Sequence, residues 1–428
     1  MDYLAEQIRR ILDTQHYTLQ FNEGATVSYE GVLEQSGLGL RELVKAGEEI
    51  IGYIYPHAPL ELILAHGLTP SLMRAIPGVS SGFEESLQTF ACSYILNLYN
   101  QRTNEQLPQI TGLLFPSNTC DSLQNLTDIW KIRFPDDRIY RLTYPVTRYA
   151  DDDSAEIYLK NELELLSKMI ESTLDRPFMM DNYERAVSMV REFRNDAQFL
   201  YSARVVDPEV LSYTELSRLV RSFLTAPVVP VASEIHRVSL SVKEKMKSKG
   251  FLDLINSIMS GFQEKDFSKA KPFKPPSGPR ILVVGGMVEP QAIATIINGI
   301  NGVSDSIVVS DLLSFGFKSV FAPPLDKNRD PFEEMAKSIL AAPGEPTQEG
   351  LQYRMSFLKD LVKALHIDGL LICEQSFCDP DQFEAPSIEK VALEAGIRTV
   401  RIPIDPELSD RARIEVKIQT FLESAGYT

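Results

Sequence analysis

Two short stretches of the sequence place a cysteine directly before an aspartate, and they are its clearest candidates for chemistry. They read FPSNTCDS at residues 115–122 and QSFCDPDQ at residues 375–382. Each follows an apolar run and precedes a helical pattern, so Cys120 and Cys378 are predicted to lie at helix N-termini. The positive end of a helix dipole favours the thiolate, which is the form of cysteine that binds metals.

The elements around the two cysteines are also equivalent. The apolar runs GLLFP and DGLLIC, at residues 112–116 and 368–373, are predicted strands that lead into the two loops. Ligands of open α/β sheets collect outside the carboxyl ends of the strands, so two such domains facing each other can present one sulfur each to a shared ligand. The residues alone leave a second interpretation open, in which each cysteine is a small buried apolar side chain.

The rest of the chain predicts an α/β protein with two Rossmann-like parallel-sheet domains that face a cleft, with a helical segment between them. An N-terminal helical segment covers residues 1–47, and alternating strands and helices over 48–150 predict the first α/β domain. Helical spacing dominates 151–270. Residues 271–279 are rich in proline and lysine and predict a linker, and the α/β alternation resumes over 280–428.

Composition narrows the classes of function. The chain has 43 basic and 59 acidic residues and a net charge of −16, which argues against general nucleic-acid binding. It has no apolar run near the roughly 20 residues that span a bilayer and no secretory signal at its start, so we expect a cytoplasmic protein without a membrane span. Four cysteines in 428 residues are too few for a disulfide framework, which leaves buried thiols, a nucleophile or metal ligands.

Five stretches together resemble the benzoyl-CoA reductase and 2-hydroxyacyl-CoA dehydratase superfamily, and most closely the smaller cluster-carrying subunit of ATP-dependent benzoyl-CoA reductases. The order and spacing of the stretches match over most of the chain. They are YIYPHAPLELILAHGLTP (53–70), FACSYILNL (90–98), LLFPSNTCDSLQNLTDIWKIRFPD (113–136), DGLLICEQSFCDPDQFEAP (368–386) and DRARIEVKIQTFLES (410–424).

The resemblance implies a cofactor. In the superfamily, cysteines from three separate segments hold one 4Fe-4S cluster in the cleft between two α/β domains, and the matching residues here are Cys92, Cys120 and Cys378. One iron then lacks a cysteine ligand and can accept water, a small ligand or a thioester carbonyl oxygen. Cys373 is a weaker candidate for that iron, the alternative being apolar packing in its strand.

The resemblance also implies a substrate side. The YPHAPLEL segment borders the substrate site in relatives, which makes Tyr55, His57 and Glu61 candidates for catalysis. Two alternatives stay open: His57 can be a surface or supporting residue, and Glu61 an acid in the first turn of a helix that is stabilised by the helix dipole.

The resemblance also implies partners. In the superfamily a separate iron-sulfur activating ATPase hydrolyses ATP, and the stretch LVVGGMVEP at residues 282–290, which is neither a dinucleotide-binding fingerprint nor a P-loop, gives this chain no nucleotide motif of its own. The resemblance further implies a larger homologous cluster-carrying subunit, an acyl-CoA substrate and an anaerobic organism. The expected protein is an iron-sulfur subunit of a benzoyl-CoA reductase-like enzyme that passes single electrons to a CoA thioester.

Three alternatives share this fold. The first is a subunit of an (R)-2-hydroxyacyl-CoA dehydratase that uses a ketyl radical. The second is a non-catalytic relay or scaffold subunit paired with a homologous catalytic chain. The third is a homodimeric double-cubane reductase of small molecules, which the small number of cysteines argues against.

Overall fold

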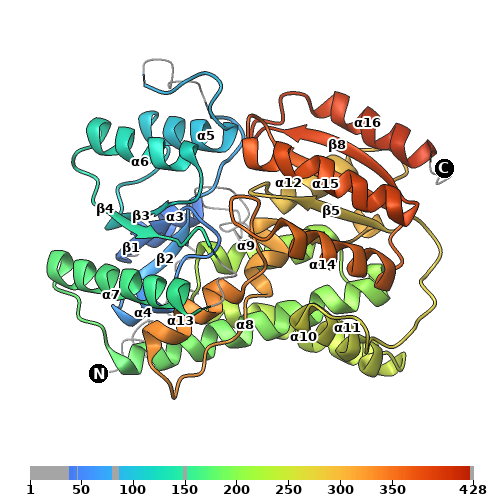
Figure 1. The fold of residues 1–428 in the computed structure, drawn as a ribbon, viewed down its shortest axis with the longest axis horizontal. Helices are drawn as coiled ribbons and strands as arrows, with labels where there is room; N and C mark the ends of the chain where they lie inside the picture. The colour runs from blue at the N-terminus through green and yellow to red at the C-terminus, as the bar shows by residue number, and fades with distance from the viewer. Residues whose placement is uncertain (1–37, 46, 80–85, 148–151, 425–428) are drawn as a thin grey trace, which may run out of the picture.

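The computed structural model describes residues 38–45, 47–79, 86–147 and 152–424. It contains two four-stranded parallel sheets flanked by helices, which confirms the predicted α/β fold (Figure 1). Of the predicted N-terminal helical segment, only the part from residue 38 is described, and the rest lies outside the described residues. Among the described residues, no helix is both long and apolar enough to cross a membrane.

The first sheet has the strand order β2-β1-β3-β4, and all its strand pairs are parallel. Strands β1, β2 and β3 are buried almost throughout, as expected for a parallel sheet with helices on both faces. Its strands are β1 (Ile50–Tyr53), β2 (Thr69–Leu72), β3 (Gly112–Ser117) and β4 (Ile139–Thr143). Its helices are α3 (Leu38–Lys45), α4 (Leu60–Ala65), α5 (Ser93–Thr103) and α6 (Asp121–Arg133).

The second sheet repeats this arrangement with the order β6-β5-β7-β8. Every residue of β7 is buried because its two faces pack into two different apolar clusters, Leu370 and Ile372 on one side and Leu371 and Cys373 on the other. Its strands are β5 (Ile281–Gly285), β6 (Val308–Leu312), β7 (Gly369–Gln375) and β8 (Arg398–Ile404). The helices of this region are α12 (Pro290–Asn298), η3 (Asp305–Ile307), the π-helical η4 (Ser314–Lys318), α13 (Pro331–Ala341), α14 (Leu351–Ala364), α15 (Asp379–Ala395) and α16 (Arg411–Ser424).

A layer of long helices joins the two sheets. Helix α8 contacts α4 of the first domain and β6 of the second, and Figure 1 shows it running beneath both sheets. Helix α13 belongs to the second half of the sequence but packs against α7. The layer comprises α7 (Ser154–Leu174), α8 (Met180–Val206), η2 (Pro208–Val210), α9 (Tyr213–Thr225), α10 (Val229–Ser248) and α11 (Leu252–Glu264).

One apolar cluster runs through the first domain, the helical layer and one face of the second sheet, so the three regions share a core. The predicted linker at residues 271–279 forms neither helix nor strand. Because both sheets are parallel, each has all its carboxyl ends at one edge, and the loops that leave these edges carry the candidate residues.

Candidate functional site

The three cysteines predicted as ligands occupy the same position in three different helices. Cys92, Cys120 and Cys378 are the N-cap residues of α5, α6 and α15. Hydrogen bonds from backbone N–H groups of the first helical turn act to lower the pKa of each thiol, as the positive end of a helix does, and burial acts in the opposite direction. The fold therefore orients three helix N-termini, each with a sulfur at its tip, for use as anionic ligands.

Cys92 and Cys378 lie side by side although they belong to different domains. The Ser93 amide donates a hydrogen bond of 2.9 Å to the Ser376 carbonyl oxygen, and Gln375 Nε2 donates one of 2.6 Å to Ser93 Oγ. The neighbouring Cys378 thiol lowers the pKa of Cys92, and the same interaction raises the pKa of Cys378. The start of α5 is thus fixed against the loop between β7 and α15.

Cys120 lies in the same domain as Cys92, at the start of α6, which packs against α5. Burial raises the pKa of its thiol to about 11, and the charge of Cys92 raises it further. Without a positive charge nearby, the protein therefore disfavours thiolates at Cys120 and Cys378. A metal centre removes that penalty because a coordinating thiol is deprotonated outright. Three thiols at three helix N-termini, one buried and two half-buried, fit the donor set of a 4Fe-4S cluster with one iron left open.

Cys373 has a different environment from the other three cysteines. It is fully buried in β7, where it pairs with Gly285 and Ile402, and its side chain packs in the apolar cluster on one face of the second sheet. Burial raises the pKa of its thiol, with smaller contributions from Asp381 and Glu374. These surroundings support the packing role that the sequence left open for Cys373.

Asp381 is a buried carboxylate beside the cysteine group, and sequence reasoning assigned it no role. It stands in the first turn of α15, and its Oδ2 accepts a hydrogen bond of 3.1 Å from the Gln375 amide. Burial raises its pKa to about 7. A Cβ on Gly286 would stand 2.4 Å from Asp381 Oδ1, so that glycine gives the carboxylate its room.

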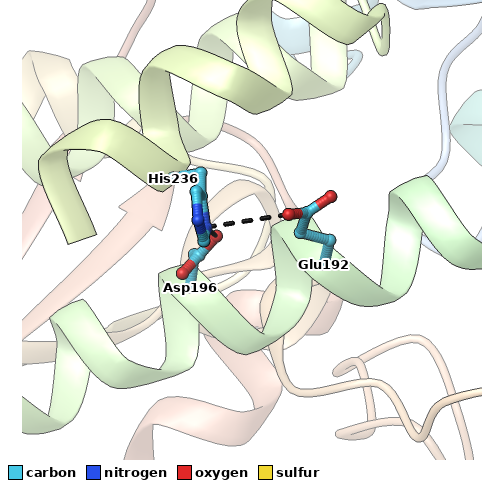
Figure 2. Close-up of side chains that lie close together, drawn as sticks. All are labelled: Glu192, Asp196 and His236. Carbon is cyan, nitrogen blue, oxygen red and sulfur yellow. Dashed lines mark hydrogen bonds and ion pairs between the residues drawn. The ribbon is translucent and has the colours of Figure 1, made fainter. Parts of the chain in front are cut away.

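A second cluster of ligand-type side chains lies on the helical layer. Among the described residues, only Glu192, Asp196 and His236 form a group of three whose ligand atoms all lie within 4.8 Å of one another (Figure 2). His236 Nδ1 is 2.9 Å from Asp196 Oδ2, and this hydrogen bond raises the pKa of the imidazole. A raised pKa favours the imidazolium, which pairs with carboxylates and does not bind metal. The arrangement is that of an exposed ion pair.

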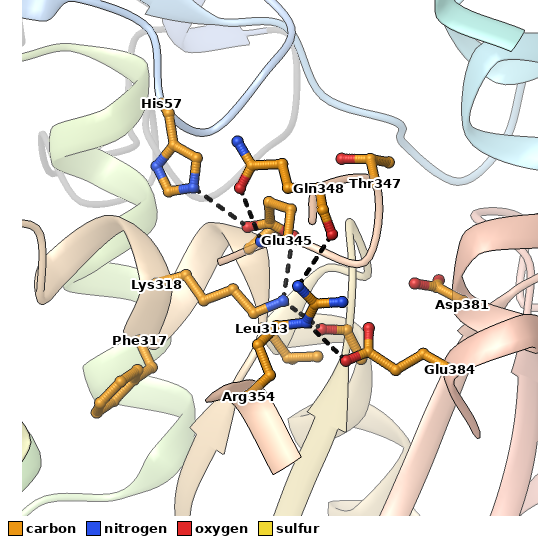
Figure 3. Close-up of polar contacts among 12 residues, drawn as sticks. His57, Leu313, Phe317, Lys318, Glu345, Thr347, Gln348, Arg354, Asp381 and Glu384 are labelled. Atoms are coloured by element: carbon orange, nitrogen blue, oxygen red, sulfur yellow. Dashed lines mark hydrogen bonds and ion pairs between the residues drawn. The ribbon is translucent and has the colours of Figure 1, made fainter. Parts of the chain in front are cut away.

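Tyr55 and His57 join the first domain to a loop of the second. Tyr55 Oη and Thr347 Oγ1 are 3.0 Å apart, and His57 Nε2 lies 3.7 Å from Glu345 Oε1. Figure 3 shows His57 pointing at Glu345. The two rings also contact each other edge to face, with 5.8 Å between centroids. The structure thus brings two of the three predicted residues together at the carboxyl end of β1.

Glu345 is the centre of this polar cluster. Its Oε2 accepts hydrogen bonds from Ser314 Oγ at 2.7 Å and from Lys318 Nζ at 3.1 Å, and Lys318 also donates to the Gly285 carbonyl oxygen at 3.0 Å. The side chains of Lys318 and Glu345 are 8% and 2% exposed, so this is a buried ion pair. Removing one partner of such a pair typically costs about 3–5 kcal/mol because it leaves an uncompensated buried charge.

Glu61 does not join Tyr55 and His57 in their contacts with the second domain. It lies in the first turn of α4, buried, with its Oε1 3.5 Å from Arg194 Nη1 on α8. The structure therefore places Glu61 against the helical layer. This ion pair suits the alternative in which the acid holds the turn in place.

Three residues of the site had no signal in the sequence strong enough to find them. Lys318 and Glu345 come from segments without a chemical motif, and they meet His57 only because the two domains face each other (Figure 3). Asp381 was visible as the second aspartate of CDPDQ, one helical turn after Cys378. This spacing of three residues places Asp381 beside Cys378 at the start of the helix, and it is the one sequence signal that could have identified Asp381.

Comparison with known proteins identifies a family that matches nearly the whole chain. A family described as "2-hydroxyglutaryl-CoA dehydratase, D-component" matches residues 56–425. The beta subunit of lactoyl-CoA dehydratase from Anaerotignum propionicum is 23% identical over 384 residues, which are 89% of this chain and 92% of the relative. The (R)-phenyllactyl-CoA dehydratase beta subunit of Clostridium sporogenes is 22% identical, over 90% and 94%. A benzoyl-CoA reductase subunit of Thauera aromatica is 23% identical, over 88% and 90%.

Proposed function

The chain belongs to the 2-hydroxyglutaryl-CoA dehydratase D-component family, and we propose that it is the iron-sulfur subunit of an enzyme that passes single electrons to a CoA thioester. Its relatives carry the names of acyl-CoA dehydratase and benzoyl-CoA reductase subunits. The proposal includes a homologous partner subunit and a separate ATPase that supplies the electrons.

The observation that carries this proposal is that three cysteines are N-cap residues and that two of them, Cys92 and Cys378, lie side by side across the two domains. Cys92, Cys120 and Cys378 come from three segments of two domains, and each sits at the positive end of a helix. A 4Fe-4S cluster held by these residues supplies low-potential electrons one at a time and an open iron for an oxygen ligand. Cys92 is buried and Cys120 and Cys378 are half-buried, which limits the access of water to the sulfurs.

The remaining residues of the site supply charged groups and proton donors. Lys318 and Glu345 form a buried ion pair in the second domain, so a positive charge with its counter-ion lies where that domain meets the first. From the first domain, His57 lies 3.7 Å from Glu345, and Tyr55 contacts Thr347 of the same loop. A hydroxyl and an imidazole in that position are suitable proton donors to a reduced thioester.

The experiment that tests this function is an anaerobic turnover assay of the protein with its co-purifying subunit, the ATPase, ATP and a panel of acyl-CoA thioesters. ATP-dependent conversion of at least one thioester, abolished in Cys120→Ala, is the expected result. Turnover without ATP, or turnover that survives Cys120→Ala, contradicts the proposal.

Ring reduction and dehydration are two forms of the proposed reaction. The dehydratase form has specific support in the lactoyl-CoA and phenyllactyl-CoA relatives, and the reductase form in the benzoyl-CoA relative. The same assay separates them: loss of water from a 2-hydroxyacyl-CoA gives an enoyl-CoA without net reduction, whereas ring reduction consumes two electrons per benzoyl-CoA.

A further inference from the structure

A cavity of about 530 Å³ lies where loops from both domains meet, outside the carboxyl ends of β2, β5, β7 and β8. Its volume is within the range of roughly 300–1,000 Å³ that is usual for small-molecule sites. Arg74 reaches it from the first domain, Arg221 from the helical layer, and Glu289 from the second domain. The cavity is therefore built by all three regions of the molecule.

The cavity borders the cysteine group. Two of its lining residues, Tyr94 and Gln375, are close neighbours in sequence of Cys92 and Cys378, and both are almost completely buried. Tyr94 Oη donates a hydrogen bond of 2.6 Å to the Met73 carbonyl oxygen, which ties α5 to the loop that carries Arg74. A ligand in this cavity thus lies next to the residues that would hold the cluster.

The lining combines apolar side chains with four charged ones, Arg74, Arg221, Glu289 and Asp405. Arg74 Nη1 is 3.7 Å from Glu289 Oε2, and the Arg74 side chain is only 6% exposed. Among the described residues, no donor reaches Glu289 Oε1 or Gln291 Oε1, although both oxygens are buried. Buried acceptors without partners cost free energy, so these two oxygens are available to N–H or O–H groups of a ligand.

These features favour one part of a CoA thioester over the others. A purely apolar ligand in this cavity would leave Glu289 Oε1 and Gln291 Oε1 without hydrogen-bond donors. The pantetheine arm carries two amide N–H groups and a hydroxyl, and its phosphate is an anion of the kind that arginine binds in bidentate fashion.

We propose that this cavity binds the 4′-phosphopantetheine arm of the CoA thioester. The amide and hydroxyl donors bond to Glu289 Oε1 and Gln291 Oε1, and the phosphate pairs with Arg74 and Arg221. This assignment rests on the proposed function, because it assumes a thioester substrate, and it adds the subsite that holds the non-reacting part. The arm then directs the thioester towards the cysteine group.

The test is calorimetric titration of the anaerobically purified full-length chain with 4′-phosphopantetheine, and separately with adenosine 3′,5′-bisphosphate. The wild-type protein is expected to bind 4′-phosphopantetheine. Two variants are expected to weaken that binding at least tenfold: Arg74→Met, which removes the guanidinium, and Ala292→Phe, which fills the cavity from α12 without changing charge.

Two control variants match these changes elsewhere. Arg102→Met removes an arginine in the last turn of α5 that forms an ion pair with Asp137. Ala412→Phe adds a ring to the exposed face of α16. Both are expected to bind 4′-phosphopantetheine as the wild type does. Equal affinity in Ala292→Phe and wild type, or tight binding of the adenosine bisphosphate with none of 4′-phosphopantetheine, overturns the assignment.

Iron content separates this assignment from the proposed function. A wild-type chain that carries about four irons but does not bind 4′-phosphopantetheine refutes the cavity assignment and leaves the iron-sulfur proposal intact. A chain that binds 4′-phosphopantetheine in this cavity but never incorporates iron supports the cavity and refutes the iron-sulfur proposal. If Arg74→Met does not fold, the binding of 4′-phosphopantetheine by Ala292→Phe still tests the cavity assignment.

Discussion

The loop after β3 and the loop after β7 build the same local structure in two domains. In each, a parallel strand ends, one residue takes a positive φ, a cysteine caps the next helix, and an exposed aspartate follows. They differ in their surroundings. Burial is the main cause of the raised pKa of Cys120, whereas Cys378 forms a hydrogen bond with Cys92 and has the buried carboxylate of Asp381 one turn away. Equivalent backbone positions thus supply the ligands, and the neighbouring side chains determine how each ligand behaves.

The loops also differ in how they reach the left-handed conformation. Asn118 has φ 62° in the first loop, and Phe377 has φ 62° in the second. Asparagine adopts this region readily, but for a bulky residue it is an outlier that costs roughly 1–2 kcal/mol. The Phe377 side chain is 57% exposed, so packing does not repay this cost. The second loop is therefore the more strained of the two.

The largest expected effect comes from removing either sulfur. We expect Cys120→Ala and Cys378→Ala to lower the iron content equally, from about four irons per chain to less than one, because each loop supplies one of only three thiolates. Iron quantitation after anaerobic reconstitution measures this. Cys373→Ala is the matched control and keeps its iron, since that thiol packs in an apolar cluster. Iron loss in only one of the two variants, Cys120→Ala or Cys378→Ala, would show that the two loops do not play equivalent roles in holding the cluster.

The next effect distinguishes the loops by pH. The folded-state pKa of Asp381 is about 7, well above its unfolded value of 3.8, so its stabilising contribution is complete below pH 4 and is lost as the pH rises through 7. Three pKa units correspond to at most about 4 kcal/mol. We expect Asp381→Asn to make the iron-free protein more resistant to urea at pH 8 and to change it little at pH 4.

Asp379→Asn is the control for that experiment, because Asp379 lies in the same helical turn but is exposed. Its urea midpoints are expected to follow those of the wild type at both pH values. If Asp381→Asn shows the same loss of stability between pH 4 and pH 8 as the wild type, then Asp381 does not set the difference between the two loops.

The smallest effect concerns backbone strain. Phe377→Gly is expected to raise the free energy of unfolding by about 1 kcal/mol, because glycine adopts a positive φ without steric cost. Asn118→Gly, the same change in the first loop, is expected to alter it by less than about 0.5 kcal/mol. Paired thermal or urea unfolding of the two variants measures the difference. Equal effects in the two loops would show that Phe377 is not strained.

The sequence predicted the parts of this structure that depend on local pattern. Alternating apolar runs and helical spacing were sufficient for two parallel sheets, because buried parallel strands are apolar on both faces. The positions of Cys120 and Cys378 at helix starts followed from the strand-loop-helix order around them, and the structure has both as N-caps. The family itself was recognisable from five quoted stretches and is confirmed by the match over residues 56–425.

Contacts between the domains could not be predicted. The pairing of His57 with Glu345, and of Arg74 with Glu289, joins residues far apart in the chain whose segments carry no shared motif. The same holds for α13, which belongs to the second half of the sequence and packs against α7 of the helical layer. Such contacts depend on how two folded domains pack against each other. The hydrophobic periodicity of the sequence gives information only on single helices and strands.

The central claim is that the two Cys-Asp loops and Cys92 hold one cluster, and direct analysis of the metal tests it. The measurement is iron and sulfide quantitation of the anaerobically purified protein with EPR of the dithionite-reduced sample, for the wild type and Cys120→Ser. We expect about four irons and four sulfides per chain, with an EPR signal that is lost or altered in the variant. No iron after purification and reconstitution would mean that the matching loops are structural features of two similar domains, and the iron-sulfur function would have to be withdrawn.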